Sequence, residues 1–256
     1  MRAPHAALLL AMLAASSGQA AGPATGAGDV VAFNASVRVE VDAAGKPIKV
    51  EAPADLPEAI RAFIEKRVAS WQYAAAKQDG VPAAAVTFVQ VGACALPVAN
   101  GYRLGLDFKG NGPGILDSGP WFMPPPRYPT EMQRVGAEGS YRVSYAIQAD
   151  GTTKVREINP MEGTGNRHAS AFRDALTSWI EGLRYQPEQV NGVPVTTEMS
   201  FPVDFILRRG GSRPAYRAEA ESRALSSNEC IAASMPSGPL PIAQNSPVKI
   251  TPVPAG

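Results

Sequence analysis

The chain has 256 residues, 45% of them hydrophobic, and a formal net charge of +1 at pH 7. This length is enough for two small hydrophobic cores, whereas 24 glycines and 24 prolines indicate many turns and linkers. A charge so close to neutral excludes a general attraction to nucleic acid or to an anionic membrane.

The first 20 residues have the pattern of a secretory signal peptide. Arg2 precedes an apolar run from Ala6 to Ala15, and the small residues Gly18 and Ala20 follow. We expect cleavage after Ala20, which also removes Arg2 and leaves a mature chain of about zero formal charge. The apolar run is shorter than the roughly 20 residues that span a bilayer. An uncleaved anchor is the alternative.

After a short leader over residues 21–29, residues 30–108 predict a small α+β unit. Val37, Val39 and Val41 alternate with polar residues, which is typical of a half-buried strand. Apolar residues at helical spacing follow between positions 60 and 71. A strand over 83–91 then leads into an extra hairpin that turns at Asn100-Gly101. We expect this hairpin to cover the edge of the unit's sheet.

Residues 109–126 are rich in glycine and proline, which predicts a linker. Gly110–Gly114 could suggest a phosphate-binding loop. However, no lysine and hydroxyl residue follow at the spacing that nucleotide binding requires. We therefore expect no nucleotide and no other cofactor here.

Residues 127–208 predict a second α+β unit. Tyr141, Val143, Tyr145 and Ile147 form one face of a strand that ends at the Asp150-Gly151 turn. Five large apolar residues then share one face of a helix: Phe172, Leu176, Trp179, Ile180 and Leu183. The final strand is predicted over Val195–Leu207, where apolar and polar residues alternate. At about 3.3 Å per residue it would be roughly 40 Å long, more than a small sheet needs.

The two predicted units repeat one pattern. The strand residues Val37, Val39 and Val41 and the turn residue Gly45 recur 106 positions later, at Val143, Tyr145, Ile147 and Gly151. Farther along, the displacement is 112, which relates Tyr73 to Tyr185 and Gly80-Val81-Pro82 to Gly192-Val193-Pro194. A shared helical or strand period would not also align a tyrosine and a turn. We interpret the chain as two copies of one unit, each a small antiparallel sheet packed by a helix.

The tail over 209–256 is of low complexity, and disorder is the ordinary expectation for such a composition. A strand-like run near its end and the presence of Cys230 leave open that it folds back. Cys94 and Cys230 are the two cysteines of the chain, and a disulfide between them is permitted in an oxidising compartment. Two unpaired buried thiols are the alternative.

The sequence does not indicate catalysis. His168 is the one histidine of the mature chain, and Ser170 lies two positions away, but no orienting third group is evident. A Ser/His hydrolase is therefore the least favoured reading. With two isolated cysteines there is no metal-ligand spacing either, so we expect no metal site and no enzyme.

The second unit resembles the C-terminal domain of TonB-type energy transducers over about a third of the chain. The residues that carry the resemblance are Arg127-Tyr128-Pro129, Gly139, Asp150-Gly151, Leu183–Pro187 and Phe201–Phe205. One departure is Pro124-Pro125-Pro126, which stands where transducers often carry a polar residue ahead of the Tyr-Pro pair. Side-chain contacts that the family makes there are not assumed for this chain.

The resemblance implies a periplasmic domain that grips an extended segment of an outer-membrane receptor along its last strand. Strand addition uses backbone groups, so it requires an open edge more than particular side chains. We expect the partner-binding residues to be Arg127 and Tyr128 together with the last strand. From that strand we expect Val195, Thr196, Glu198, Ser200, Pro202 and Asp204 to take part. Pro202 lacks a donor, which fits an edge position but interrupts pairing alongside it.

The function indicated is that of a periplasmic TonB-like protein, related to energy-transducer-dependent transport, that binds an outer-membrane receptor or another envelope protein. We expect no integral membrane anchor after signal cleavage and no Pro-rich spacer of the transducer kind. The alternative is a structural envelope scaffold that forms a homodimer through the same edge strand. The sequence alone does not identify the partner.

Overall fold

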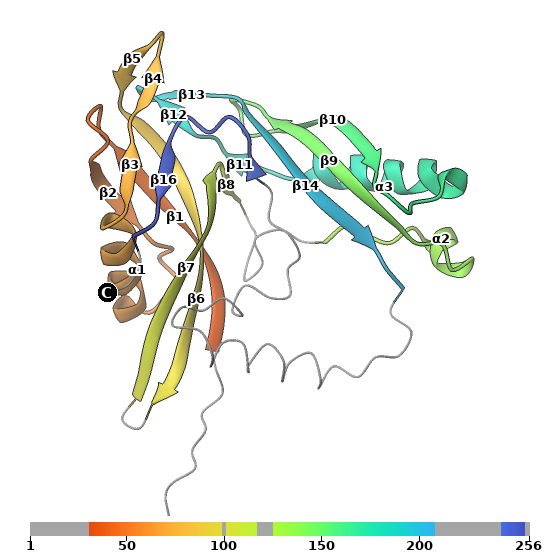
Figure 1. Cartoon of the computed structure of the whole chain (residues 1–256), viewed down its shortest axis with the longest axis horizontal. Helices are drawn as coiled ribbons and strands as arrows, with labels where there is room; N and C mark the ends of the chain where they lie inside the picture. Colours follow the sequence, from red (N-terminus) through yellow and green to blue (C-terminus); the bar gives the residue numbers. More distant parts are fainter. Residues whose placement is uncertain (1–30, 99–100, 117–124, 208–241, 254–256) are drawn as a thin grey trace, which may run out of the picture.

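The computed structural model describes residues 31–98, 101–116, 125–207 and 242–253 (Figure 1). The predicted signal peptide, the leader and Cys230 lie outside the described residues. Among the described helices, none is both long enough and apolar enough to cross a membrane.

The first sheet is built on a long antiparallel pair of strands. β1 (Val31–Val41) pairs with β6 (Ala85–Val98) along its whole length. β2 (Pro47–Glu51) adds to the other side of β1, and β7 (Gly101–Gly112) adds to β6 as the second arm of a hairpin. This is the extra hairpin expected from the Asn100-Gly101 turn. Helix α1 (Glu58–Ala69) packs on one face of the sheet, where its Ile64 and Val68 are fully buried.

The alternation of β1 separates a core face from a polar face. Val37, Val39 and Val41 are buried under α1, whereas Arg38 and Glu40 point the other way.

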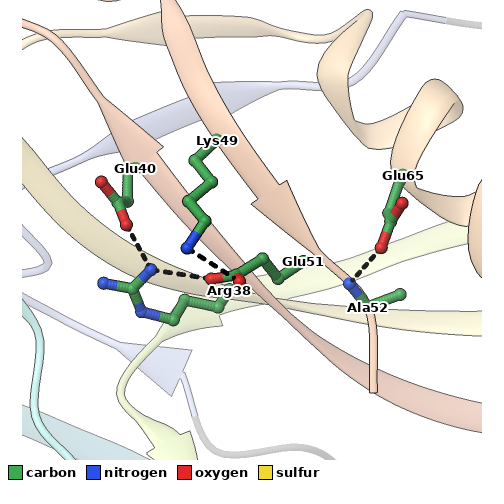
Figure 2. Close-up of polar contacts among 6 residues, drawn as sticks. All are labelled: Arg38, Glu40, Lys49, Glu51, Ala52 and Glu65. Atoms are coloured by element: carbon green, nitrogen blue, oxygen red, sulfur yellow. Dashed lines mark hydrogen bonds and ion pairs between the residues drawn. The ribbon is translucent and has the colours of Figure 1, made fainter. Parts of the chain in front are cut away.

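On the polar face the Arg38 guanidinium binds the carboxylates of Glu40 and Glu51, as Figure 2 shows. Lys49 binds Glu51 at 2.9 Å. These pairs are partly exposed, so each stabilises the fold by only about 0 to 1 kcal/mol. In the same view the Glu65 carboxylate of α1 accepts a hydrogen bond from the Ala52 N–H at 3.0 Å, which ties the helix to the end of β2.

The second sheet has the order β10-β9-β14-β15 and is antiparallel throughout. Its strands are β9 (Gly139–Ile147), β10 (Thr153–Pro160), β14 (Thr197–Phe205) and β15 (Ile242–Ala243). α2 (Thr130–Arg134) precedes β9, and η1 (Asn166–His168) leads into α3 (Ala169–Gly182).

Helix α3 covers one face of this sheet. Its Phe172, Leu176 and Ile180 are buried against aromatic side chains of β9 and β14. The rings of Phe172 and Phe205, for example, lie 4.7 Å apart. The helical spacing in the sequence therefore predicted the packed face of α3 correctly.

Short strands join the two sheets (Figure 1). β12 (Gln189–Val190) pairs with β13 (Val193–Pro194) and also with β6, so residues of the second half extend the first sheet. β8 (Gly114–Ile115) pairs with β11 (Tyr185–Gln186). β3 (Gln72–Ala74) pairs with β16 (Lys249–Thr251), while β4 (Ala76–Gln78) and β5 (Val81–Ala83) form a hairpin. The molecule is thus a mixed α+β fold of interlocked antiparallel sheets.

Two sequence expectations are corrected by these strands. The stretch predicted as a linker from Lys109 begins as strand, because β7 continues to Gly112 and β8 follows at once. Glycine disfavours a regular strand but supplies the positive φ of 142° at Gly110 where the β6–β7 register shifts. The described part of the tail is ordered: β15 pairs with β14 of the second sheet, and β16 pairs with β3 in a separate two-stranded sheet.

The last strand is also shorter than predicted. β14 covers nine residues, Thr197–Phe205, instead of thirteen. At its start the Val195 N–H donates to the Glu188 carbonyl. Beyond its end the Leu207 N–H donates to the Glu138 carboxylate at 2.6 Å. Side-chain alternation continues past both ends, but these backbone groups bond to loop residues outside the β14–β9 ladder.

The candidate binding edge of strand β14

Strand β14 is bound by β9 on one side, and its other side is the edge that the sequence predicted as a binding site. Residues of a strand direct their backbone groups alternately to its two sides. On the outer side the Glu198 carbonyl accepts from the Gln244 N–H at 2.8 Å, and the Glu198 N–H donates to the Asn245 side-chain oxygen at 2.7 Å. Ser200, Pro202 and Asp204 therefore direct their backbone groups outward as well.

The chain itself covers the first part of this edge. β15 lies antiparallel to β14, with Ala243 opposite Met199 and Ile242 opposite Ser200. The Asn245 side chain also approaches the Thr196 carbonyl at 3.5 Å. Of the predicted binding residues, Thr196, Glu198 and Ser200 thus lie beneath the C-terminal segment. The expectation of an edge that is open along its whole length is corrected, because β15 and Asn245 already satisfy these backbone groups.

The rest of the outer side, from Pro202 to Ile206, is called the distal edge below. Within the described parts of the chain, no strand pairs with it. Asp204 is exposed, and 62% of the Ile206 surface is accessible. Pro202 offers a carbonyl but no N–H, so the first outward donor of the distal edge is the Asp204 N–H. Two of the predicted residues, Pro202 and Asp204, are brought together here.

A buried carboxylate, which no sequence pattern indicated, joins the two sheets to the tail. Glu188 is fully buried between β11 and β12 and accepts hydrogen bonds from three hydroxyl groups. These come from Thr87 of β6 at 2.6 Å, Ser246 of the tail at 2.7 Å and Thr197 of β14 at 3.0 Å. Burial raises the pKa of Glu188, and the three hydroxyls and the charge of Lys249 oppose that shift. A glutamate in a loop ordinarily faces solvent, so no pattern marked it.

From α2 to β14 the elements follow in the order helix, hairpin, helix, strand. Comparison with protein families finds a match for this part of the chain. Residues 124–207 match the Gram-negative bacterial TonB protein C-terminal family. The resemblance seen in the sequence is confirmed over this part of the chain, and we call residues 124–207 the TonB C-terminal domain. β15 lies outside the match. A comparison of the chain with curated proteins finds no match.

The family match also indicates the functional class of the domain. TonB C-terminal domains are non-enzymatic, act in the periplasm and interact with proteins of the envelope. The site in this TonB C-terminal domain is accordingly considered as a binding surface.

Arg127 and Tyr128 open the TonB C-terminal domain and lie in different environments. The Arg127 side chain is exposed. Tyr128 is half-buried, and its ring packs edge-on against Phe205 at 5.3 Å and against Phe172 at 5.9 Å. Its hydroxyl donates to the Ala137 carbonyl. Tyr128 therefore supports the end of β14 from the core side, through its contact with Phe205, and does not lie on the outer edge.

The two residues considered for catalysis, His168 and Ser170, lie at the start of α3. His168 immediately precedes α3 without a side-chain capping hydrogen bond, and Ser170 is exposed in the first turn. In the described parts of the chain, no cluster of three or more metal-ligating residues is found. Cys94 is fully buried on β6. Because Cys230 is not among the described residues, its pairing with Cys94 remains a prediction.

Proposed function

We propose that this protein is a periplasmic TonB-like protein that binds an envelope protein or peptide by strand addition to the distal edge of β14. The observation that carries the proposal is the outward direction of the Pro202 and Asp204 backbone groups in the TonB C-terminal domain. An outer-membrane receptor segment is the partner that the family suggests. Export by the predicted signal peptide, with cleavage after Ala20, would bring the protein to that compartment.

The distal edge supplies few backbone groups. Each net hydrogen bond contributes about 0.5 to 1.5 kcal/mol, so a segment paired only with Asp204 and its neighbours binds weakly. Side-chain packing at alternate positions of the added strand must supply the remaining affinity and the selectivity.

We also propose that the two halves are copies of one unit, and the strand registers support this. Val37 lies opposite Val89 in the first sheet, and Val143 lies opposite Phe201 in the second. Val37 and Val143 are 106 positions apart in the sequence, and Val89 and Phe201 are 112 positions apart. These are the two displacements that relate the copies in the sequence. A shared apolar period alone does not reproduce a cross-strand register.

Turn geometry gives independent support for the repeat. Gly45 and Gly151 both have a φ of 82°, and a Cβ at either would clash with a tyrosine carbonyl oxygen. That oxygen belongs to Tyr73 in the first half and to Tyr185 in the second, at 2.5 and 2.1 Å. The later turns, Asp79-Gly80 and Asn191-Gly192, also share positive φ at both positions, as a type I′ hairpin requires.

The copies would then have different roles. In the first copy, β7 occupies the outer edge of the last strand, β6, from Phe88 onward. In the second copy, β15 occupies only Met199 and Ser200 of β14. We assign a structural role to the first copy and the binding role to the second.

The test is capture of partners from periplasmic and outer-membrane fractions by two variants of the exported protein. Asp204→Pro removes the outward N–H, whereas Asp204→Ala removes the side chain and keeps the backbone donor. Because the Asp204 N–H does not face β9, both variants should fold, which circular dichroism would check. Capture that is lost with proline and kept with alanine supports the proposal. Equal capture by both variants overturns it.

The scaffold alternative predicts self-association through the same edge. Sedimentation would then show a dimer of the wild-type protein without any envelope extract, and Asp204→Pro would convert it to a monomer. That result would favour a homodimeric scaffold over a receptor-binding protein.

A further inference from the structure

The edge of β6 in the first copy corresponds to the distal edge of β14 in the second. A displacement of 112 relates Gln90–Cys94 to Pro202–Ile206. In the first copy this edge already carries an added strand, because β7 lies along it with Phe108 opposite Val91 and Leu106 opposite Ala93. The pairing of β7 with β6 therefore serves as a template for the pairing that we expect at the distal edge.

We infer that the distal edge takes an extended segment that runs antiparallel to β14 and places a bulky apolar side chain opposite Val203. This rests on the proposed function and specifies its partner. The partner is a peptide segment of defined direction and pattern, and the template for both is β7.

The direction follows from two strands of the molecule. β7 is antiparallel to β6, and β15 is antiparallel to β14 itself. A segment that runs in the direction of β15 places its carboxyl end toward Ser200 and its amino end toward Ile206. Antiparallel pairs are also slightly more stable per residue than parallel ones.

The apolar position follows from Phe108. Residues directly opposite each other share a face of the sheet. Phe108 faces the helix side of the first sheet, where its ring packs edge-on against Trp71 at 5.5 Å. The residue opposite Val203 would likewise face the α3 side of the second sheet, beside the core residues Phe201, Val203 and Phe205. A bulky apolar side chain there extends the existing core, whereas a charged one would be buried without a partner.

Pro202 does not interrupt such a strand. It corresponds to Gln90, and the β6–β7 register shifts between Gln90 and Val91. β7 bulges at this point, where Gly110 has its positive φ. In the template a second stretch of regular pairing begins at Val91, beyond the register shift, and Val91 corresponds to Val203. A segment that pairs from Val203 onward does not use the donor that Pro202 lacks.

Charge adds one condition on the partner. In the template Asp107 lies opposite Gly92, the residue that corresponds to Asp204. An acidic residue opposite Asp204 would place like charges across the ladder, which is destabilising. The segment should carry a basic or neutral residue at this position, next to the apolar one.

The probe is a synthetic peptide with the sequence from Tyr102 to Lys109 and the change Asp107→Lys, added to isotope-labelled mature protein. A nitroxide label is placed at either end of the peptide. We expect amide shifts at Asp204 and Ile206. The amino-end label should broaden Ile206 and Leu207, and the carboxyl-end label should broaden Phe201 and Ile242. A control peptide that also carries Phe108→Asp should bind about tenfold more weakly or worse.

The reverse broadening pattern would overturn the antiparallel direction. Equal binding of the control peptide would overturn the apolar position, and absence of shifts at Asp204 and Ile206 would overturn the inference as a whole. The proposed function fails by a different result, the capture of envelope partners by Asp204→Pro. The peptide and capture experiments can therefore fail separately.

Discussion

The Glu188 carboxylate accepts a 2.6 Å hydrogen bond from the Thr87 hydroxyl, although the two residues are 101 positions apart in the chain. Thr87 lies on β6 of the first sheet, and Glu188 precedes β12, which pairs with β6. Ser246 of the tail binds the same carboxylate oxygen as Thr87. The two sheets and the segment that covers β14 are thus joined at one buried group.

Replacement of Glu188 tests this junction. Glu188→Ala leaves three buried hydroxyls without their acceptor, so we expect a loss of about 2 to 4 kcal/mol in the free energy of unfolding. Glu188→Gln keeps an acceptor and should cost much less. Denaturant unfolding of both variants measures the difference, and equal losses would indicate that the hydroxyls find other partners.

The same residue predicts a pH dependence. Because burial raises the pKa of Glu188 in the folded state, its protonated form is favoured there. The resulting stability is fully present below the unfolded value, about 4.5, and declines as the pH rises through the higher folded pKa. Relative to Glu188→Gln, the wild-type protein should therefore lose stability as the pH is raised from 4 toward neutrality, a range of roughly 3 units. A constant difference between the two melting temperatures would contradict this.

The glycine turns give a matched set of variants. Gly151→Ala and Gly45→Ala place a methyl group 2.1 and 2.5 Å from a backbone carbonyl oxygen, at a φ of 82°. Gly163→Ala has a φ of 84° but nothing within 4 Å, so it carries the conformational cost of about 1 kcal/mol without the clash. We expect both turn variants to be less stable than this control in thermal unfolding. Similar stability of all three would remove a main support for the repeat.

The tail segment is tested at Asn245. Its side chain accepts the Glu198 N–H, so Asn245→Ala should speed hydrogen exchange at the Glu198 amide. Gln244→Ala is the control, because Gln244 contributes its backbone N–H to the Glu198 carbonyl. If both variants leave the exchange rate at Glu198 unchanged, the Asn245 contact does not hold the segment on β14.

The predicted disulfide between Cys94 and Cys230 closes a loop of about 135 residues, worth about 4 to 5 kcal/mol in the chain-entropy model. Mass spectrometry of the exported protein without reduction should find one cross-linked peptide pair. Two alkylated thiols would show that the cysteines are unpaired.

Much of the fold could be predicted because its large elements carry periodic patterns. The alternation from Tyr141 to Ile147 and the helical spacing from Phe172 to Leu183 both bury the expected faces. The two-residue strands β12 and β15 have no such pattern, since a run of two residues shows no period. Their positions depend on backbone pairing with distant residues, so the cover over Ser200 could not be predicted from the sequence.

The most direct measurement of the central claim is hydrogen exchange at the Asp204 amide in the presence of a captured envelope partner. The Met199 amide, which faces β9 in the ladder, serves as the internal reference. We predict that partner binding slows exchange at Asp204 and leaves Met199 nearly unchanged. An Asp204 amide that exchanges at the same rate in the free and bound protein would contradict binding at the distal edge.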